Sequence, residues 1–270
     1  MSSRRTLITG AAGGMGRAVA RRFAARGDSL LLIDVMPESL DALCTQLGSA
    51  ARAQVCDISD PEAVSALPAW VADGGLLAAI VHTAGLSPSM SDWRSIMSVN
   101  YVGTARLLDA LGPLVEPGGA AVCISSNSSY LIPAIPAVSE LLREALAPDL
   151  LEHLEALREV PEWSSALAYG LSKHGVRELV ARLAAPWGAR GARIVSLSPG
   201  ITDTPMGRRE YEHQPVMHEM SKLTPAGRDA TPEDIADVVE FLCSGSASYI
   251  SGSDVLVDGG QTAALGAIPK

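Results

Sequence analysis

Tyr169 and Lys173, four positions apart, could carry out proton transfer at an alcohol or carbonyl group. On a helix this spacing places both side chains on one face. A free phenol has a pKa of about 10, too high for a base at neutral pH, and a nearby ammonium group would lower it. The pair could therefore donate and accept a proton, although a Tyr-x-x-x-Lys motif alone is common by chance.

A second candidate site is the glycine-rich segment near the N-terminus. An apolar run ending at Thr9 leads into Gly10-Ala11-Ala12-Gly13-Gly14-Met15-Gly16, and a helical pattern follows at once. Glycines allow a tight turn and let a pyrophosphate approach the N–H groups at a helix N-terminus. The segment therefore predicts a dinucleotide site. Its expected cofactor-binding residues are Gly10, Gly13, Gly14, Met15 and Gly16.

Asp34 closes the next apolar run, about 20 residues after the glycines. A carboxylate here accepts hydrogen bonds from the adenosine ribose hydroxyls and repels a 2′-phosphate. No Lys or Arg lies inside the glycine loop or directly after Asp34. These residues predict NAD rather than NADP as the cofactor. The alternative role of Asp34 is to cap a helix that begins near Pro37.

Composition limits the classes of partner. The 270 residues carry a net charge of −9, which argues against nucleic acid or an anionic membrane, since Lys and Arg bind phosphates. No apolar run approaches the roughly 20 residues of a membrane span. The apolar stretch near the N-terminus is broken by the glycine-rich segment, which argues against a signal peptide. Four scattered cysteines have no metal-binding spacing and indicate a reducing compartment. We expect a soluble cytoplasmic protein with no metal site.

Short apolar runs alternate with helical patterns, which predicts βαβ units wound into one parallel sheet. No repeat or low-complexity linker divides the chain, so we expect residues 1–270 to form a single Rossmann-type α/β domain. This domain is a doubly wound, three-layer α/β/α sandwich with about seven strands. The predicted strands are Thr6–Thr9, Leu30–Asp34, Ala53–Asp57, Ala78–Thr83, Ala121–Ser125, Arg193–Ser198 and Asp254–Val257. The predicted helices are Met15–Arg26, Pro37–Leu47, Ser91–Leu111, Ala168–Ala185 and Pro232–Leu242.

Two segments interrupt this alternation. Residues 131–163 combine prolines with leucines at helical spacing, which predicts a helical insertion. Residues 205–224 hold methionines among charged residues without a clean period, which predicts a substrate-binding loop. The insertion could cover the site, form a partner surface or be purely structural, and its sequence does not separate these alternatives.

The order of the motifs resembles the short-chain dehydrogenase/reductase family over nearly the whole chain. This resemblance implies hydride transfer between a nicotinamide and a secondary alcohol or ketone. The matching residues are the glycine loop, Asp34, Asp57, Ala84-Gly85, Asn100, Ser126, Tyr169 with Lys173, Pro199-Gly200 with Thr204, and Val257-Asp258-Gly259-Gly260.

The resemblance also implies a role for each matched residue. Tyr169 would be the general acid/base, and Lys173 would lower its pKa and hold the nicotinamide ribose. Ser126 would bind the substrate oxygen, and Asn100 would position a water that leads protons to Lys173. The implied cofactor contacts, besides the glycine loop, Asp34, Tyr169 and Lys173, are Asp57, Ile58, Ala84, Gly85, Pro199, Gly200, Thr202 and Thr204.

Three features depart from the family pattern. His82-Thr83 stands where two asparagines are usual, and we interpret His82 as structural rather than as a base. Gly10, Gly13 and Gly16 also fit the spacing of the extended epimerase/dehydratase branch, although chain length favours the short type. The stretch from Ser126 to Tyr169 is long, which resembles the 3α-hydroxysteroid dehydrogenase/carbonyl reductase branch and implies a dimer.

We therefore expect an NAD-dependent dehydrogenase/reductase of a small-molecule alcohol or ketone, forming a homodimer or homotetramer. Leucines and methionines flanking the site favour a bulky apolar, alicyclic or hydroxysteroid-like substrate. Two alternatives remain: an NAD-binding sensor or scaffold without turnover, and an extended-type epimerase or dehydratase acting on nucleotide sugars. The presence of both Tyr169 and Lys173 argues against the sensor.

Overall fold

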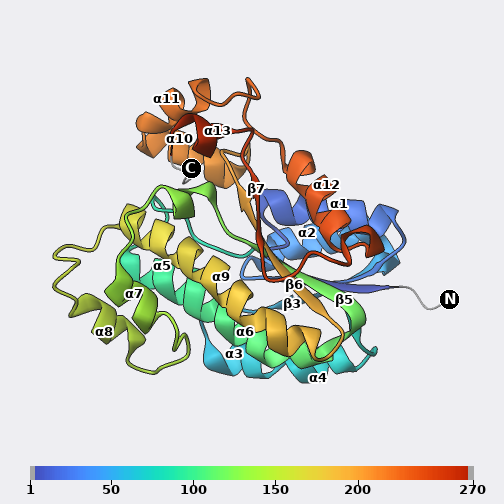
Figure 1. Cartoon of the computed structure of the whole chain (residues 1–270). Coiled ribbons are helices and arrows are strands. Elements are labelled where there is room, and N and C mark those ends of the chain that lie inside the picture. Colours follow the sequence, from blue (N-terminus) through green and yellow to red (C-terminus); the bar gives the residue numbers. More distant parts are fainter. Residues whose placement is uncertain (1–3, 267–270) are drawn as a thin grey trace.

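The computed structural model describes residues 4–266, which form one parallel sheet between two layers of helices (Figure 1). The strand order is β3-β2-β1-β4-β5-β6-β7, and every strand pair is parallel. The order reverses between β1 and β4, the switch point at which doubly wound sheets bind ligands. The predicted single Rossmann-type α/β domain is confirmed. The strands are β1 (Arg5–Thr9), β2 (Ser29–Asp34), β3 (Ala51–Val55), β4 (Leu77–His82), β5 (Val115–Ile124), β6 (Arg193–Pro199) and β7 (Asp254–Val257).

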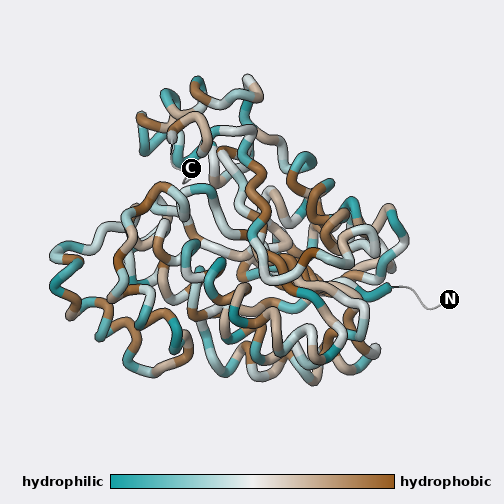
Figure 2. The backbone as a smooth tube through the Cα atoms, viewed as in Figure 1, coloured by the Kyte–Doolittle hydropathy of each residue, from teal (hydrophilic) through white to brown (hydrophobic). Residues whose placement is uncertain are grey.

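The central strands are apolar because helices cover both faces of the sheet. All residues of β4 and β6 are buried, whereas β3, at the sheet edge, has none. Neighbouring residues of β1 point to opposite faces, so Leu7 and Ile8 belong to two separate apolar clusters. Figure 2 shows the hydrophobic residues concentrated along these strands.

Helices α1 and α12 pack together on one face of the sheet, and α5, α6 and α9 lie on the other (Figure 1). No helix in the described part of the chain is long and apolar enough to cross a membrane. The predicted helix Ser91–Leu111 is divided by η2 (Ser98–Gly103), one turn of π-helix. The helices are α1 (Gly14–Ala25), α2 (Pro37–Leu47), α3 (Pro61–Ser65), α4 (Leu67–Ala72), α5 (Trp93–Met97), α6 (Thr104–Leu111), α9 (Ser165–Gly188), α12 (Pro232–Leu242) and α13 (Gln261–Ala264).

Both interrupting segments are helical. Residues 131–163 contain the expected short helices, α7 (Pro136–Leu141) and α8 (Leu150–Glu155). Residues 205–224, where no period predicted a helix, form α10 (Pro205–His213) and α11 (Val216–Lys222). The side chain of Thr204 caps α10 by accepting from the Gly207 N–H. Neither α10 nor α11 buries an apolar side chain, which explains why the sequence shows no helical period there.

Candidate active site

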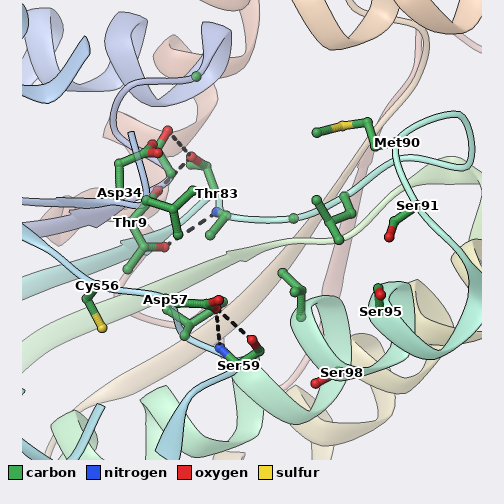
Figure 3. Close-up of a pocket in the computed structure, with 18 of the residues that line it drawn as sticks. Thr9, Asp34, Cys56, Asp57, Ser59, Thr83, Met90, Ser91, Ser95 and Ser98 are labelled. Atoms are coloured by element: carbon green, nitrogen blue, oxygen red, sulfur yellow. Dashed lines mark hydrogen bonds between the residues drawn. The ribbon is translucent and has the colours of Figure 1, made fainter. Parts of the chain in front are cut away.

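A cleft opens at the carboxyl ends of the strands and consists of two adjoining cavities. The larger, of about 660 Å³, extends from Asp34, at the end of β2, and Asp57, after β3, to Met90 (Figure 3). Leu151 also lines it. The smaller, of about 70 Å³, is lined by the predicted catalytic residues. The two cavities adjoin, since four residues line both: Thr83, Gly85, Leu86 and Met206.

The glycine loop forms one wall of the cleft. Gly10 has φ +63°, and a Cβ there would lie 2.6 Å from the Ala84 backbone nitrogen. A Cβ on Gly16 would lie 2.1 Å from the Gly10 carbonyl oxygen. Gly10 and Gly13 line the larger cavity and Met15 the smaller, while Gly14 packs against Thr204. This side-chain-free turn leading into α1 fits a dinucleotide pyrophosphate.

Two carboxylates lie at the far end of the larger cavity. The two oxygens of Asp34 accept the Ala12 N–H at 2.9 Å and the Met36 N–H at 3.1 Å, which ties the glycine loop to the end of β2. A carboxylate has about four acceptor positions, so Asp34 can also accept from ribose hydroxyls. Asp57 accepts from the Ser59 N–H and hydroxyl (Figure 3). Ile58, Ala84 and Gly85, which the family resemblance implies as cofactor contacts, also line this cavity.

Helix α9 brings Tyr169 and Lys173 to the smaller cavity, which Ser126 also lines. The Ser126 hydroxyl, which accepts the Ser128 N–H at 3.2 Å, lies near enough to the phenol of Tyr169 to lower its pKa. The hydroxyl of Ser125 instead donates to the Lys173 carbonyl at 2.8 Å and so holds α9 against β5. The structure thus gives the two adjacent serines different roles, and Ser126 is the one beside Tyr169.

The environment of Tyr169 favours its neutral form. Burial raises the pKa of Tyr169, the Ser126 hydroxyl lowers it, and the charge of Glu210 raises it. Lys173 Nζ donates to the Ile124 carbonyl at 3.0 Å and lies 5.8 Å from the Tyr169 ring centre. Burial lowers the pKa of Lys173 to about 8. The net shift of the Tyr169 pKa is upward, whereas the sequence argument expects Lys173 to lower it, because in this geometry burial dominates.

Asn100 lies within the π-helical turn η2 and is 1% exposed. Its Oδ1 accepts the Leu86 N–H at 2.7 Å, and its Nδ2 donates to the Leu86 carbonyl at 2.9 Å. A Cβ on Gly85 would lie 3.1 Å from Asn100 Oδ1 and 3.4 Å from Lys173 Nζ. Asn100 therefore fixes the chain after β4 and lies close to Lys173, consistent with the predicted placement.

His82 is buried at the end of β4 and has both ring nitrogens engaged. Nδ1 pairs with the Thr9 hydroxyl and Nε2 with the Thr104 hydroxyl, each at 2.7 Å. Burial, together with the charge of Lys173, lowers the pKa of His82 to about 3. A neutral imidazole with both nitrogens hydrogen-bonded fits the structural role expected of it, because no nitrogen is free to accept a substrate proton.

The end of β6 and the segment that follows it line the cleft with only some of their predicted residues. Pro199 and Gly200 line the smaller cavity. The Thr202 hydroxyl donates to the Gly200 carbonyl at 3.1 Å, and Thr204 caps α10, so both hydroxyls hold the chain and neither residue lines a cavity. Of the methionines in residues 205–224, Met206 lines both cavities, whereas Met217 and Met220 line neither.

Several residues that line or act on the site are not among those predicted from the sequence, among them Leu151 and Glu210. Leu151, on α8, lines the larger cavity and shows that the insertion borders the cleft. Glu210, on α10, is 6% exposed, and its charge acts on Tyr169. A helix without an apolar period gives no signal that one of its carboxylates is buried.

Comparisons with known proteins agree with this geometry. Residues 4–136 match the family model described as short chain dehydrogenase, and residues 151–262 match the one described as Enoyl-(Acyl carrier protein) reductase. The chain is 33% identical over 268 residues to D-threitol dehydrogenase of Mycolicibacterium smegmatis, covering 95% of this chain and 92% of that protein. It is 30% identical over 270 residues to 3-alpha-hydroxysteroid dehydrogenase/carbonyl reductase of Comamonas testosteroni, covering 96% of each.

A solved structure shows the same architecture. The crystal structure of levodione reductase superposes with a TM-score of 0.79 at 27% identity, covering 96% of this chain and 98% of that one. Fold, motif order and similarity along nearly the full length thus agree. The chain belongs to the short-chain dehydrogenase/reductase family and is an oxidoreductase of alcohols and ketones.

Proposed function

We propose that this protein is an NAD-dependent dehydrogenase/reductase that interconverts a secondary alcohol and its ketone. One observation carries the proposal: Ser126, Tyr169 and Lys173 meet at a small cavity that adjoins the glycine-walled cavity. When bound, the nicotinamide would supply the hydride acceptor or donor.

In the direction of oxidation, the Ser126 hydroxyl holds the substrate oxygen beside Tyr169. As the phenolate, Tyr169 accepts the hydroxyl proton at Oη and becomes the neutral phenol while the carbon gives up its hydride, and the proton then passes on toward Lys173. Burial, which raises the Tyr169 pKa, disfavours the phenolate. Alcohol oxidation therefore accelerates as the pH rises, whereas ketone reduction uses the protonated phenol.

The preference for NAD rests on Asp34. Its carboxylate lines the cleft where the adenosine ribose would lie and would repel a 2′-phosphate. Asp57 places a second carboxylate on the same side of the cavity, and no Lys or Arg belongs to the glycine loop itself. This charge pattern favours NAD over NADP.

The lining of the cleft supports two substrate classes. Leu86, Met90, Leu151 and Met206 give the cleft apolar walls, which supports a bulky alicyclic or hydroxysteroid-like substrate. A polyol is the second candidate, since two relatives are named D-threitol dehydrogenase and galactitol 2-dehydrogenase. Three serine hydroxyls that could pair with a polyol also line the larger cavity: Ser91, Ser95 and Ser98. A homo-oligomeric state and a cytoplasmic location stay predictions from sequence.

The test follows NADH formation with hydroxysteroids, substituted cyclohexanols and polyols, and with NADP in place of NAD. We expect turnover with NAD and one substrate class. Replacement of Tyr169→Phe should lower kcat by about 10²–10⁴-fold. Tyr249→Phe is the matched control, because Tyr249 is fully exposed. Wild-type turnover by Tyr169→Phe would refute the assigned acid/base, and NAD binding without turnover of any substrate would favour a sensor.

A further inference from the structure

Helix α10 docks onto the domain in an unusual way. It has nine residues, from Pro205 to His213, and the single one that is buried is Glu210. The following helix, α11, buries none of its residues. A surface helix normally docks through an apolar stripe. Here the buried group is a carboxylate, whose dehydration is costly unless hydrogen bonds replace the lost water.

Four hydrogen-bond donors surround that carboxylate. Oε1 accepts the Ser87 hydroxyl, the Ser89 N–H at 3.0 Å and the Ser89 hydroxyl, and Oε2 accepts the side-chain amide of Gln214. Burial raises the pKa of Glu210, but these bonds outweigh it and hold the pKa below its ordinary value. The group therefore stays ionised at neutral pH, where charge-assisted hydrogen bonds are strongest.

The two serines that bond to Glu210 belong to the segment that Asn100 holds in place beside the catalytic residues. Ser87 and Ser89 follow Leu86, whose backbone N–H and carbonyl are both held by Asn100. On the other side, Met206 precedes Glu210 by one helical turn and lines both cavities. The contact thus joins the segment fixed by Asn100 to the helix that carries a cavity wall. Arg209 adds two exposed bonds to Ser89.

We propose that Glu210 is a positioning residue that latches α10 onto Ser87 and Ser89 and thereby holds Met206 over the reacting cavity. The latch is polar on both sides. Opening it returns the carboxylate and the serines to water, so opening is less costly than exposing an apolar stripe. Substrate can therefore enter and leave by release of α10 without disturbing Asn100, Tyr169 or Lys173.

The test replaces Glu210→Ala, with Glu212→Gln on the same helix as the control, since Glu212 is exposed. Trypsin cleavage after Lys222, in α11, should accelerate on the order of tenfold in Glu210→Ala and stay unchanged in the control. The KM for the alcohol should rise on the order of tenfold, with kcat changing much less. The KM measurement rests on the proposed function, whereas the cleavage measurement does not. Absence of alcohol turnover would therefore count against the proposed function, and unchanged cleavage would count against the latch.

Ser87→Ala tests the latch from the other side. Alone it should accelerate cleavage after Lys222, and in the Glu210→Ala background it should add nothing, because its partner is already absent. Additive effects of the two substitutions, or unchanged cleavage in Glu210→Ala, would overturn the proposal. If Glu210→Ala does not fold, Glu210→Gln serves instead, since an amide cannot accept from all four donors; unchanged cleavage there overturns the proposal equally.

Discussion

The two segments that interrupt the βα alternation border the same cleft but are held by opposite kinds of contact. Residues 131–163 pack through apolar side chains, among them Val138, Leu142 and Leu154, which are at most 1% exposed and belong to the core cluster under α9. Residues 205–224 pack through hydrogen bonds, among them those of the Glu210 carboxylate with Ser87 and Ser89 and those of the Tyr211 and Ser221 hydroxyls with Asp229. One segment extends the hydrophobic core, and the other is held mainly by hydrogen bonds.

Because of this difference, we expect residues 131–163 to form a fixed wall of the cleft and residues 205–224 to form a wall that can be released. The Leu142 carbonyl also accepts from Arg182 at 3.0 Å and from the Tyr101 hydroxyl, so the insertion is tied to α9 and η2. Its buried leucines, Leu142, Leu150 and Leu154, pack within the chain and so are not available to a partner surface. Exposing them would cost several kcal/mol, at about 25 cal/mol per Å² of apolar area. We therefore expect α8 to stay in place while α10 opens.

The largest expected effect is on stability, from Leu154→Ala. Leu154 is completely buried, so its truncation should lower the free energy of unfolding by about 2–5 kcal/mol. Chemical denaturation measures this directly. Leu146→Ala, at a position 45% exposed in the same insertion, should change it by less than about 0.5 kcal/mol. Equal effects at the two positions would mean that the insertion is not part of the core.

A smaller effect, on the pH profile, is expected from Glu210→Gln. The charge of Glu210 raises the Tyr169 pKa, so its removal should lower that pKa. Alcohol oxidation needs the phenolate and accelerates as pH rises through the Tyr169 pKa. The rising limb of kcat for oxidation should therefore move to lower pH, measured at saturating alcohol and NAD.

Glu212→Gln controls for the loss of one charge from α10 and should leave the limb in place. A limb displaced to higher pH in Glu210→Gln would contradict the sign of the interaction. A limb that does not move would show that Glu210 and Tyr169 are uncoupled.

Much of the fold was predictable because buried parallel strands and amphipathic helices leave clear periods. The exceptions have physical causes. Strand β5 begins at Val115, earlier than predicted, because Gly118 and Gly119 signal a turn although the strand only shifts register there. Helices α3 and α4 are too short to show a period.

Motif spacing singled out Tyr169 and Lys173, and the order of the family motifs pointed to Ser126 and Asn100, because these motifs are local in the sequence. The contribution of Glu210 was not predictable. It depends on hydrogen bonds with the Ser89 N–H and hydroxyl, which lie 121 positions away in the sequence. In the sequence, a helix with one buried carboxylate has the same polar pattern as a helix that is fully exposed to solvent. Hydrogen-bonded docking leaves no hydrophobic pattern in a sequence.

The smallest effect is expected from Arg94→Gln, which tests whether charge also holds the insertion. Arg94 pairs with Glu152 and Glu155 on α8, but all three side chains are more than one-third exposed. Exposed ion pairs are screened by water and salt and contribute little. The stacked rings of Trp93 and Trp163, 4.8 Å apart, stay in place without the guanidinium.

We therefore expect Arg94→Gln to leave both the unfolding midpoint and protease cleavage within residues 131–163 unchanged. Raising the salt concentration should be equally without effect on that cleavage. If Arg94→Gln instead released the insertion as readily as Glu210→Ala releases α10, both segments would be electrostatically latched. The distinction between a fixed and a releasable wall would then have to be abandoned, because apolar burial alone would not hold α8.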